Sequence, residues 1–419
     1  LDSFLSFNYV TPPMTMFEGV SHVMPGHYIT VSLDNITDNV WWDLSKIKAV
    51  DRSEVDCIEE IRKTLDSAVE LRLRSDVPFG AFLSGGVDSS SVVGVMAKYL
   101  QKPVKTFSIG FNDPKFDETP FAIEASNRFS TEHKFEKGES NLLGLWEKVT
   151  YHCDQPHGDV SFMPMYRVAK LASNQVKMVL TGDGADELFC GYDKYKDFFS
   201  SENSDNLSNY EFQEVYRKNI SLFNDEEKKS LYKTSFCKYV DLNGAASIVN
   251  ELCEKSKNMD RINQALYIDV MLLLPGNNLV KPDRMGMAAS IENRSPFLDF
   301  RMIELAFSMP GSLKLKNGET KYIFKKSVED LIGPDLAYRK KQMFTVPIGE
   351  WLKYELRELV EDLLLSERAV SRGIFNSNYL KQLYSDHCTG EKNNTREIRA
   401  IMALEIWFRI FIDKSSNYL

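Results

Sequence analysis

The feature that most constrains the fold is a short loop of glycines and hydroxyl residues that joins two apolar segments. Residues 79–83 form an apolar run, residues 84–90 read SGGVDSS, and residues 92–100 have the apolar periodicity of a helix. This order predicts a strand, a tight loop and a helix. Because the first backbone N–H groups of a helix carry a partial positive charge, they bind anions. The loop therefore predicts a site for a phosphate group.

The small side chains of the loop support this prediction. Two glycines let the backbone come close to an anion, and three serines supply hydroxyl donors; these residues are Gly85, Gly86, Ser84, Ser89 and Ser90. The alternative is an N-cap and a tight turn on an ordinary strand-to-helix crossover. The chain contains neither a Walker-type phosphate loop nor the G-x-G-x-x-G dinucleotide motif.

The carboxylate of Asp88 is the unusual member of the loop. A carboxylate repels a neighbouring phosphate unless a cation lies between the two groups. Mg²⁺ prefers oxygen ligands and commonly binds the phosphates of nucleotides. Asp88 therefore indicates a nucleotide that carries a metal ion.

Composition excludes several functional classes. The 419 residues carry a formal net charge of −9, so no basic surface for nucleic acid is indicated. The six cysteines contain no CxxC pair, which is typical of reduced thiols in the cytoplasm rather than of disulfides or zinc sites. No apolar run approaches the ~18 residues that a membrane-spanning helix needs. A chain of this length is expected to bury a large core and to contain two or three subdomains.

Strands and helices alternate in the first half of the chain. Apolar runs predict strands at 77–83, 104–111, 132–135 and 176–180, and helical patterns begin near residue 53 and cover 119–129, 140–153 and 161–173. This alternation predicts an α/β fold with a parallel sheet flanked by helices. Ligands bind beyond the carboxyl ends of the strands in such sheets. The loops at 84–90, 108–118 and 181–187 are therefore expected to form one site.

The rest of the chain is organised around this part. The α/β core is expected at about 75–200, a polar helical insertion at about 200–265 and a helical remainder at 266–419. Residues 1–50 are rich in proline, glycine and aromatic residues, which predicts loops and short strands with little core of their own. We expect this segment to pack on a neighbouring domain.

A second polar loop follows the last predicted strand. Residues 181–188 read TGDGADEL and place the carboxylates of Asp183, Asp186 and Glu187 at the carboxyl end of that strand. Two simpler interpretations are a solvated acidic turn and a helix N-terminus, where acidic residues are favoured. Since Asp88 is expected at the same edge of the sheet, we interpret Asp88 and Asp186 as ligands of Mg²⁺.

Two later segments carry further candidates. Residues 283–299 combine small residues with several charges, and Arg294 is a candidate catalytic residue there. The alternative is a structural salt-bridge network in which Glu292 and Arg294 orient the loop. Residues 339–344 read RKKQMF, a basic cluster in an acidic chain. Such a cluster is usually a solvated charge run, and its functional interpretation is a cation that reaches the phosphates and the developing oxyanion.

In this order, these segments resemble the synthetase half of the asparagine synthetase family, within the PP-loop ATP pyrophosphatases. The resemblance covers nearly the whole chain and implies an ATP-dependent synthetase domain over residues 51–419. It implies that residues 84–90 hold pyrophosphate and that residues 106–111 hold adenosine. The backbone around four residues is then expected to line the nucleotide pocket: Leu83, Ser108, Ile109 and Gly182.

The resemblance also implies roles for single residues. Lys341 matches the catalytic lysine of the family, whose charge would stabilise the adenylation transition state. Asp183 stands where several relatives have glutamate, in a role of proton handling or intermediate binding, and its side chain is one methylene shorter. Cys190 replaces a glycine that is common in the family, and we interpret it as a variation without chemistry.

The implied reaction uses ATP and Mg²⁺. The chain would adenylate the side-chain carboxylate of aspartate, and ammonia would then give asparagine, with AMP and pyrophosphate as the other products. Residues 1–43 resemble the segment that leaves the glutaminase domain of the family, so such a domain is expected ahead of Leu1. The chain by itself is then expected to use ammonia rather than glutamine. A cytoplasmic location and a homodimer are further expectations.

Three alternatives differ in function. A related ligase would act on another carboxyl acceptor, such as a sugar acid or a peptide, or would close a β-lactam ring. A regulatory or scaffold protein would keep the fold without activity, and the intact residues 84–90, Asp186 and Lys341 speak against it. A nucleic-acid thiolase of the same superfamily would need a catalytic cysteine pair and a basic surface, which the sequence lacks.

Overall fold

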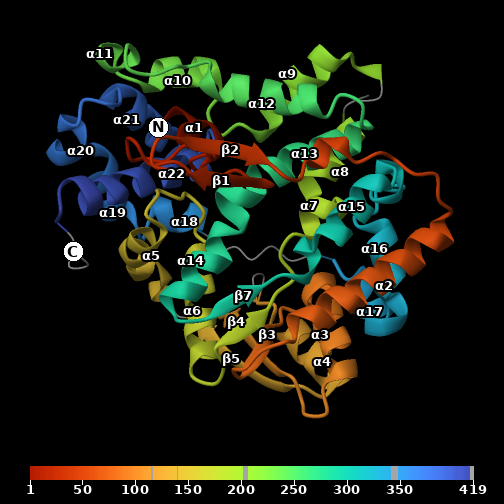
Figure 1. Cartoon of the computed structure of the whole chain (residues 1–419). Helices are drawn as coiled ribbons and strands as arrows, with labels where there is room; N and C mark the ends of the chain where they lie inside the picture. The colour runs from red at the N-terminus through yellow and green to blue at the C-terminus, as the bar shows by residue number, and fades with distance from the viewer. Residues whose placement is uncertain (115–116, 139, 202–205, 341–347, 416–419) are drawn as a thin grey trace.

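The computed structural model describes residues 1–114, 117–138, 140–201, 206–340 and 348–415. Five strands form its central sheet: β3 Phe79–Phe82, β4 Lys105–Phe111, β5 Glu132–Gly138, β6 Met178–Leu180 and β7 Glu292–Arg294. They lie in the order β5-β4-β3-β6-β7, and each neighbouring pair is parallel (Figure 1). The predicted α/β class, with a parallel sheet flanked by helices, is confirmed.

Helices cover both faces of this sheet. The first five after the N-terminal segment are α2 Glu54–Arg72, α3 Val87–Tyr99, α4 Thr119–Phe129, α5 Trp146–Cys153 and α6 Phe162–Ser173. Side chains of a strand point alternately to its two faces. Ala81 of β3 accordingly packs in the same core cluster as Val92 and Val93 of α3, while its neighbour Phe82 packs in a cluster with Val168 of α6.

Strand β7 was not predicted from the sequence. It has three polar residues, pairs with β6 in the register Met178↔Glu292, and forms one edge of the sheet. A strand of this length and polarity has neither the apolar run nor the alternation that identifies strands in a sequence. The pairing with a buried neighbour decides its conformation instead.

Helix α2 begins next to Ser53, where the sequence predicts the start of a helix. Oγ of Ser53 accepts a hydrogen bond from the backbone N–H of Asp56 at 3.1 Å, which caps the helix. The apolar residues Cys57, Ile61 and Leu65 then recur on the buried face of the helix.

The remaining helices lie mainly above the sheet in the view of Figure 1. They are α7 Ala185–Phe189, α8 Asp193–Ser201, α9 Asn209–Ile220, α10 Asp225–Leu231, α11 Thr234–Cys237, α12 Gly244–Lys255, α13 Arg261–Met271, α14 Val280–Ala288, α15 Phe300–Ser308, α16 Tyr322–Ile332, α17 Pro334–Tyr338, α18 Ile348–Lys353, α19 Arg357–Leu365, α20 Glu367–Ser371, α21 Ser377–Thr389 and α22 Thr395–Trp407. The helical character expected after residue 200 is present, and the boundaries of an insertion stay a prediction.

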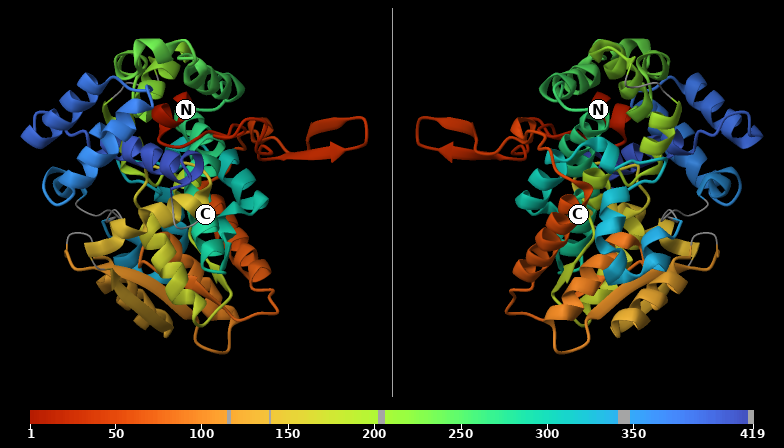
Figure 2. Two further views of the ribbon diagram at one scale, coloured as in Figure 1. Left: turned by 90° about the vertical axis from the view of Figure 1, so that its left-hand side faces the viewer. Right: turned by 90° about the vertical axis from the view of Figure 1, so that its right-hand side faces the viewer.

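The N-terminal segment has two parts with opposite environments. Helix α1 Asp2–Phe7 is buried, and the carbonyl of Ser6 accepts a hydrogen bond from the N–H of Leu222 at 2.6 Å. The hairpin of β1 His27–Val31 and β2 Ile36–Val40 instead projects far from the body of the molecule (Figure 2).

Two sequence-based exclusions can be compared with the structure. Within the described ranges, no helix combines the length and the apolar character needed to cross a membrane. All six cysteines are free thiols. Burial raises the pKa of the Cys190 thiol to about 12, so this thiol stays protonated at neutral pH.

A buried lysine makes the stability of the fold depend on pH. Lys314 is fully buried, its Nζ donates to Oδ1 of Asn263 at 2.8 Å, and desolvation lowers its pKa from 10.5 to about 7. In the unfolded chain, the same amine has its ordinary pKa. Between these two values the unfolded state binds more protons, so this lysine makes the fold more stable as pH rises.

We therefore expect Lys314→Met to remove part of the pH dependence of unfolding. At about 1.4 kcal/mol for each pKa unit, the gap in unfolding free energy between the variant and the wild type should change by roughly 3–5 kcal/mol between neutral and alkaline pH. Urea denaturation at the two pH values measures this gap. The exposed Lys102→Met should keep the wild-type profile, and an unchanged profile in Lys314→Met would contradict the buried, deprotonated state.

Candidate active site

The loop after β3 and the acidic loop after β6 lie in direct contact. A Cβ atom added to Gly182 would lie 2.8 Å from Cβ of Asp88 and 3.0 Å from the backbone nitrogen of Ser89. Real side chains do not approach that closely, so only glycine fits where the loops cross. The structure thus brings Asp88 and the acidic loop 183–187 together at the carboxyl ends of the neighbouring strands β3 and β6.

A buried ammonium joins the two loops. Nζ of Lys321 lies 2.6 Å from each carboxylate oxygen of Asp88 and 2.7 Å from Oδ1 of Asp186. The lysine side chain is 4% exposed, and the two carboxylates are mostly buried. Because hydrogen bonds between charged groups are strong, this ammonium fixes the spacing of the two loops.

The two carboxylates keep this lysine charged. Burial by itself disfavours the ammonium, but the charges of Asp186 and Asp88 outweigh burial and raise the pKa of Lys321 above its ordinary value. The site therefore contains a permanent positive charge between two negative ones at neutral pH.

Lys321 is absent from the site that the sequence predicts. It is the N-cap of α16, with a φ of 54° in the left-handed region that side chains disfavour. A lysine at this end of a helix also opposes the helix dipole. In the sequence, Lys321 directly precedes an apolar-periodic segment, and this unfavourable position for a lysine is the signal that could have identified it.

The predicted phosphate loop has an ordered backbone with its hydroxyls close together. Oγ of Ser84 lies 3.2 Å from Oγ of Ser89 and accepts from the N–H of Gly86 at 3.3 Å. Gly85 has a φ of 74°, and a Cβ there would lie 2.3 Å from the backbone of Phe121. The loop thus gathers serine hydroxyls at the N-terminus of α3, as anion binding requires.

Arg339 lies against the same loop. Its Nε donates to the carbonyl of Gly85 at 2.8 Å, and its Nη2 lies 2.8 Å from Oε1 of Glu118. Its guanidinium stacks over the ring of Phe121, with 4.4 Å between Cζ and the ring centre. Within the described part of the chain, its buried Nη1 has no hydrogen-bond partner. A donor without a partner at the edge of this loop fits an anionic ligand.

Of the two other carboxylates of the acidic loop, Glu187 is buried and Asp183 is partly buried. Desolvation raises the pKa of Asp183 and the pKa of Glu187, and the charge of Asp186 adds to the shift in both. Glu187 accepts hydrogen bonds from Nδ2 of Asn278 at 2.6 Å and from the hydroxyl of Tyr192 at 2.7 Å. Carboxyl groups with raised pKa values beside a ligand loop are candidates for proton transfer.

The donor set fits a metal ion that a nucleotide helps to hold. No group of three or more His, Cys, Asp or Glu side chains placed to hold a metal occurs among the residues that the structure describes. Mg²⁺, however, often uses only one or two carboxylates together with phosphates and water. Asp88 and Asp186 converge on one position, which the ammonium of Lys321 takes, so a metal ion would have to share these carboxylates with the lysine. Their role as Mg²⁺ ligands stays a prediction.

The residues predicted to line the nucleotide pocket lie on or just after the strands of the sheet. Ser108 and Ile109 belong to β4, Leu83 directly follows β3, and Gly182 lies in the acidic loop after β6. Oγ of Ser108 lies 3.2 Å from Nε2 of His133, and the side chain of Ile109 is buried in the core. The N–H of Leu83 donates to the carbonyl of Phe107 at 2.9 Å. The side chains of Ser108 and Ile109 and the N–H of Leu83 are thus engaged within the protein, and their contact with a nucleotide stays a prediction.

The structure describes the surroundings of one of the two remaining catalytic candidates, Arg294, but not those of Lys341. Nη1 of Arg294 donates to the carbonyls of Arg72 and Arg74 at 3.1 and 2.8 Å, and its Nε donates to Glu292 at 2.6 Å. These contacts favour the alternative in which Arg294 orients the chain, and its catalytic role stays a prediction. Lys341 lies outside the described residues.

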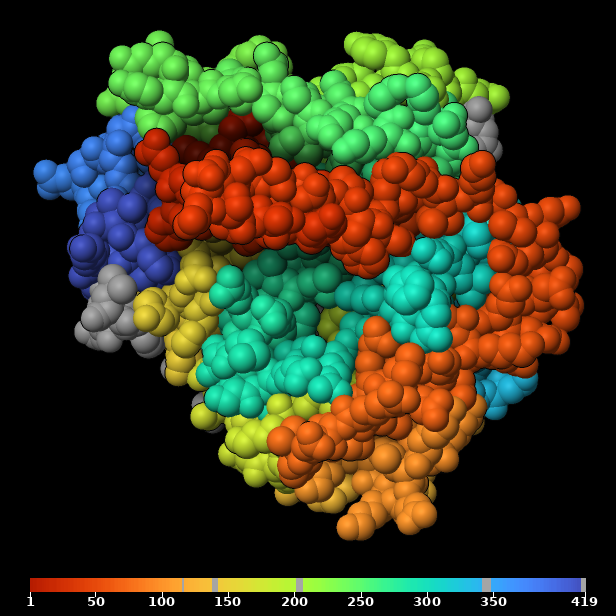
Figure 3. Space-filling model, viewed as in Figure 1, coloured from red at the N-terminus to blue at the C-terminus, as the bar shows by residue number. Residues whose placement is uncertain are grey.

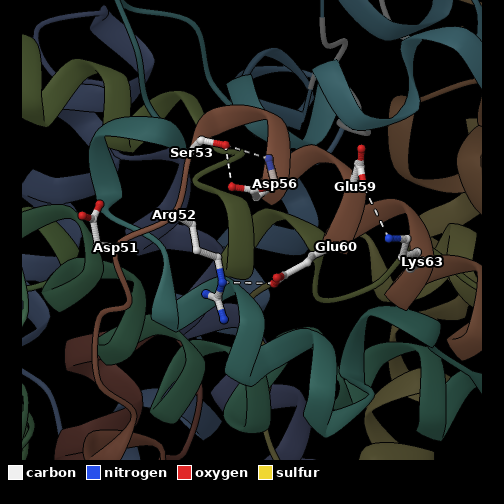
Figure 4. Close-up of a pocket in the computed structure, with 7 residues that line it drawn as sticks. All are labelled: Asp51, Arg52, Ser53, Asp56, Glu59, Glu60 and Lys63. Atoms are coloured by element: carbon white, nitrogen blue, oxygen red, sulfur yellow. Dashed lines mark hydrogen bonds and ion pairs between the residues drawn. The ribbon is translucent and has the colours of Figure 1, made fainter.

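A surface pocket of about 370 Å³ lies at the start of α2 and shares no residue with these loops (Figure 4). Two ion pairs join four of its charged groups. Nε of Arg52 lies 3.2 Å from Glu60, and Nζ of Lys63 lies 3.4 Å from Glu59. The carboxylates of Asp51 and Asp56 remain outside these pairs, so the pocket carries excess negative charge and does not suit a phosphate. We therefore place the candidate site at the carboxyl ends of β3 and β6.

Comparison with known proteins gives matches over most of the chain. Residues 60–409 match the family model described as asparagine synthase. The chain is 32% identical to asparagine synthetase [glutamine-hydrolyzing] 1 of Bacillus subtilis, over 99% of this chain and 69% of the relative. It is 25% identical to a putative asparagine synthetase of Mycobacterium bovis, over 99% of this chain and 68% of the relative. It is also 27% identical to an amidase of Penicillium rubens, over 87% of this chain and 64% of that protein.

The three-charge cluster predicts an unusual response to Mg²⁺. In Lys321→Met, the carboxylates of Asp88 and Asp186 lose the ammonium between them, and breaking a buried ion pair costs about 3–5 kcal/mol. We expect a lower melting temperature, and we expect MgCl₂ to raise it more in the variant than in the wild type. Thermal unfolding with and without MgCl₂ measures both effects.

Lys325→Met is the matched control, because Lys325 lies on the same helix and pairs with Glu319 instead. It should respond to MgCl₂ as the wild type does. An equal response in Lys321→Met would mean that the two carboxylates do not form a shared cation site.

Proposed function

Because the chain belongs to the asparagine synthase family of ATP-dependent, amide-forming ligases, we propose that it converts aspartate and ammonia to asparagine. The observation that carries the proposal is the convergence of Asp88 and Asp186 on Lys321 beside the first turn of α3. Charges of both signs next to a helix N-terminus suit a polyphosphate and its counter-ion. The names of the bacterial relatives support aspartate as the acceptor.

Activation of the carboxylate is the first chemical requirement, since a free carboxylate is a poor electrophile. In the proposed step, an oxygen of the aspartate side chain attacks the α-phosphorus of ATP. The bond between that phosphorus and the departing pyrophosphate breaks. The resulting acyl-adenylate has AMP as its leaving group.

The residues around the loop would bind and neutralise the pyrophosphate. The N–H groups at the start of α3 and the hydroxyls of Ser84 and Ser89 would donate to it. Lys321 and Arg339 would supply positive charge from two sides of the loop. Mg²⁺, when bound, would add Lewis-acid charge neutralisation on the phosphates, and Asp88 and Asp186 would hold it.

Ammonia would react in the second step. Its nitrogen attacks the carbonyl carbon of the acyl-adenylate, the bond from that carbon to the AMP oxygen breaks, and a proton leaves the new amide nitrogen. Asp183 is our candidate to accept this proton, because burial raises the pKa of its carboxyl group.

A glutamine-hydrolysing part or partner is the proposed source of ammonia in the cell. The bacterial relatives named for glutamine hydrolysis are longer than the matched region, and roughly a third of the Bacillus subtilis protein has no counterpart here. The chain alone would then accept free ammonia.

The first test is an assay of pyrophosphate release with ATP, Mg²⁺ and ammonium, with and without L-aspartate. We expect pyrophosphate and AMP to form only when aspartate is present, and mass spectrometry should detect asparagine. Pyrophosphate release that is independent of aspartate would instead favour another carboxyl acceptor. The relative named as an amidase is a reason to screen other acceptors in that case.

The lysine that the resemblance identifies allows a second test. Lys341→Ala should lower the rate of aspartate-dependent turnover by about 10²–10³, because it removes a charge that would stabilise the transition state. Lys353→Ala is the control, since Lys353 pairs with Glu350 on the next helix and should keep wild-type activity. Equal rates in the two variants would reject the proposed role of Lys341.

A further inference from the structure

A row of hydrogen-bonded side chains connects α4, β5 and β4. Oγ1 of Thr131, directly before β5, donates to Oγ of Ser126 in α4 at 2.9 Å and lies 2.8 Å from Oγ1 of Thr106 in β4. Oγ1 of Thr106 lies 2.9 Å from Nδ1 of His133 in β5. Nε2 of the same imidazole ring lies 3.2 Å from Oγ of Ser108. The row therefore begins in α4 and ends at Ser108.

The first contacts of this row fix which atoms donate. A hydroxyl group has one hydrogen to donate. Since Thr131 donates its hydrogen to Ser126, it can only accept at its contact with Thr106, and Thr106 must donate there. The oxygen of Thr106 then accepts from the ring of His133. Nδ1 of His133 therefore carries a hydrogen.

The other nitrogen of this ring is an acceptor. Desolvation lowers the pKa of His133 below its ordinary value, so the ring is neutral and has a single N–H at neutral pH. With that hydrogen on Nδ1, Nε2 accepts from the hydroxyl of Ser108. The oxygen of Ser108 has then used its hydrogen and can only accept any further hydrogen bond.

Ser108 lies next to the candidate phosphate loop. The register of β3 and β4 pairs Ala81 with Thr106, so Ser108 is level with Leu83, directly before the loop at 84–90. Side chains two apart on a strand share a face. Ala81 packs in the core cluster of α3, so the Ser108 hydroxyl lies on the side of the sheet that α3 covers. A nucleotide with its phosphates at the start of α3 would have its nucleoside part close to this hydroxyl.

The nucleoside part of ATP is the part that can donate a hydrogen bond to this oxygen. Ionised phosphate groups only accept hydrogen bonds, whereas the amino group of adenine and the ribose hydroxyls donate. We propose that His133 is a positioning residue that fixes the hydroxyl of Ser108 as an acceptor for an N–H or O–H group of the nucleoside, an inference that rests on the proposed function. Ser108 thereby discriminates between nucleotides through the orientation that His133 imposes.

The first test determines which ring nitrogen of His133 carries the hydrogen. The complete 419-residue chain is labelled with ¹⁵N at its six histidines, and the missing signals in His133→Gln assign the ring of His133. We expect ¹⁵N NMR at neutral pH to show a hydrogen on Nδ1 and none on Nε2. A hydrogen on Nε2 would overturn the proposal, because Ser108 would then be free to donate. This test needs neither a nucleotide nor turnover.

The second test compares nucleotides that each lack one donor. Calorimetry with Mg²⁺, and without aspartate or ammonium, measures the binding of ATP, inosine triphosphate, 2′-deoxy-ATP and 3′-deoxy-ATP. Wild type should bind ATP about tenfold more tightly than the analogue that lacks the donor to Ser108. In Ser108→Ala and in His133→Phe this preference should disappear. His133→Gln supplies an N–H for Thr106 and an acceptor for Ser108, so it should keep the preference.

His22→Phe is the control variant. His22 is exposed on the N-terminal segment, which is red in Figure 3 and lies above the orange part of the chain that includes β3 and β4. It should keep the wild-type preference. Because the preference compares two ligands on one preparation, a smaller folded fraction in any variant does not change it.

Each outcome of the binding test has a defined meaning. Loss of preference over inosine triphosphate in Ser108→Ala identifies the adenine amino group as the donor, and loss over one deoxy analogue identifies that ribose hydroxyl. Equal preferences over all three analogues in wild type and Ser108→Ala would overturn the proposal. A chain that binds none of the four nucleotides would overturn the proposed function and this role with it, whereas the position of the hydrogen on His133 would stand.

Discussion

The ammonium of Lys321 is the interaction on which the arrangement of the site depends. It connects the start of α3, the acidic loop after β6 and the start of α16, which are far apart in the sequence. Two partly buried carboxylates on neighbouring loops would repel each other, and a cation between them turns this repulsion into attraction. The contact at Gly182 is possible because the charges that it brings together are compensated.

The same cluster is the reason why we propose a polyphosphate ligand for this site. Near the N-terminus of α3, Lys321 contacts Asp88 and Arg339 contacts the carbonyl of Gly85, so both supply positive charge there. Both groups are positioned by protein carboxylates, so their orientation exists before any ligand arrives. A site with fixed charges loses little energy to reorganisation when charge develops on a departing pyrophosphate.

The N-terminal segment contains one part that is buried in the core and one part that is exposed. Helix α1 is part of the core, whereas the hairpin contributes almost nothing to it. Val31, Ile36 and Val40 of the hairpin are more than half exposed, so burial among the described residues does not account for these apolar side chains. Hydrogen bonds from Trp42 to Gly26 and Glu304 give the hairpin a defined position.

The sequence alone determined the fold class and the meeting of the loops after β3 and β6. The apolar runs of β3, β4 and β6 and the glycines of the loop at 84–90 are visible in each short segment by itself. Local periodicity predicts the strands, and the glycines predict the tight turn. Strand β7 and the role of Lys321 were decided by tertiary structure. A three-residue polar strand exists only because a neighbouring strand offers it hydrogen bonds. A lysine at a strained helix start is favourable only where two distant carboxylates converge on it.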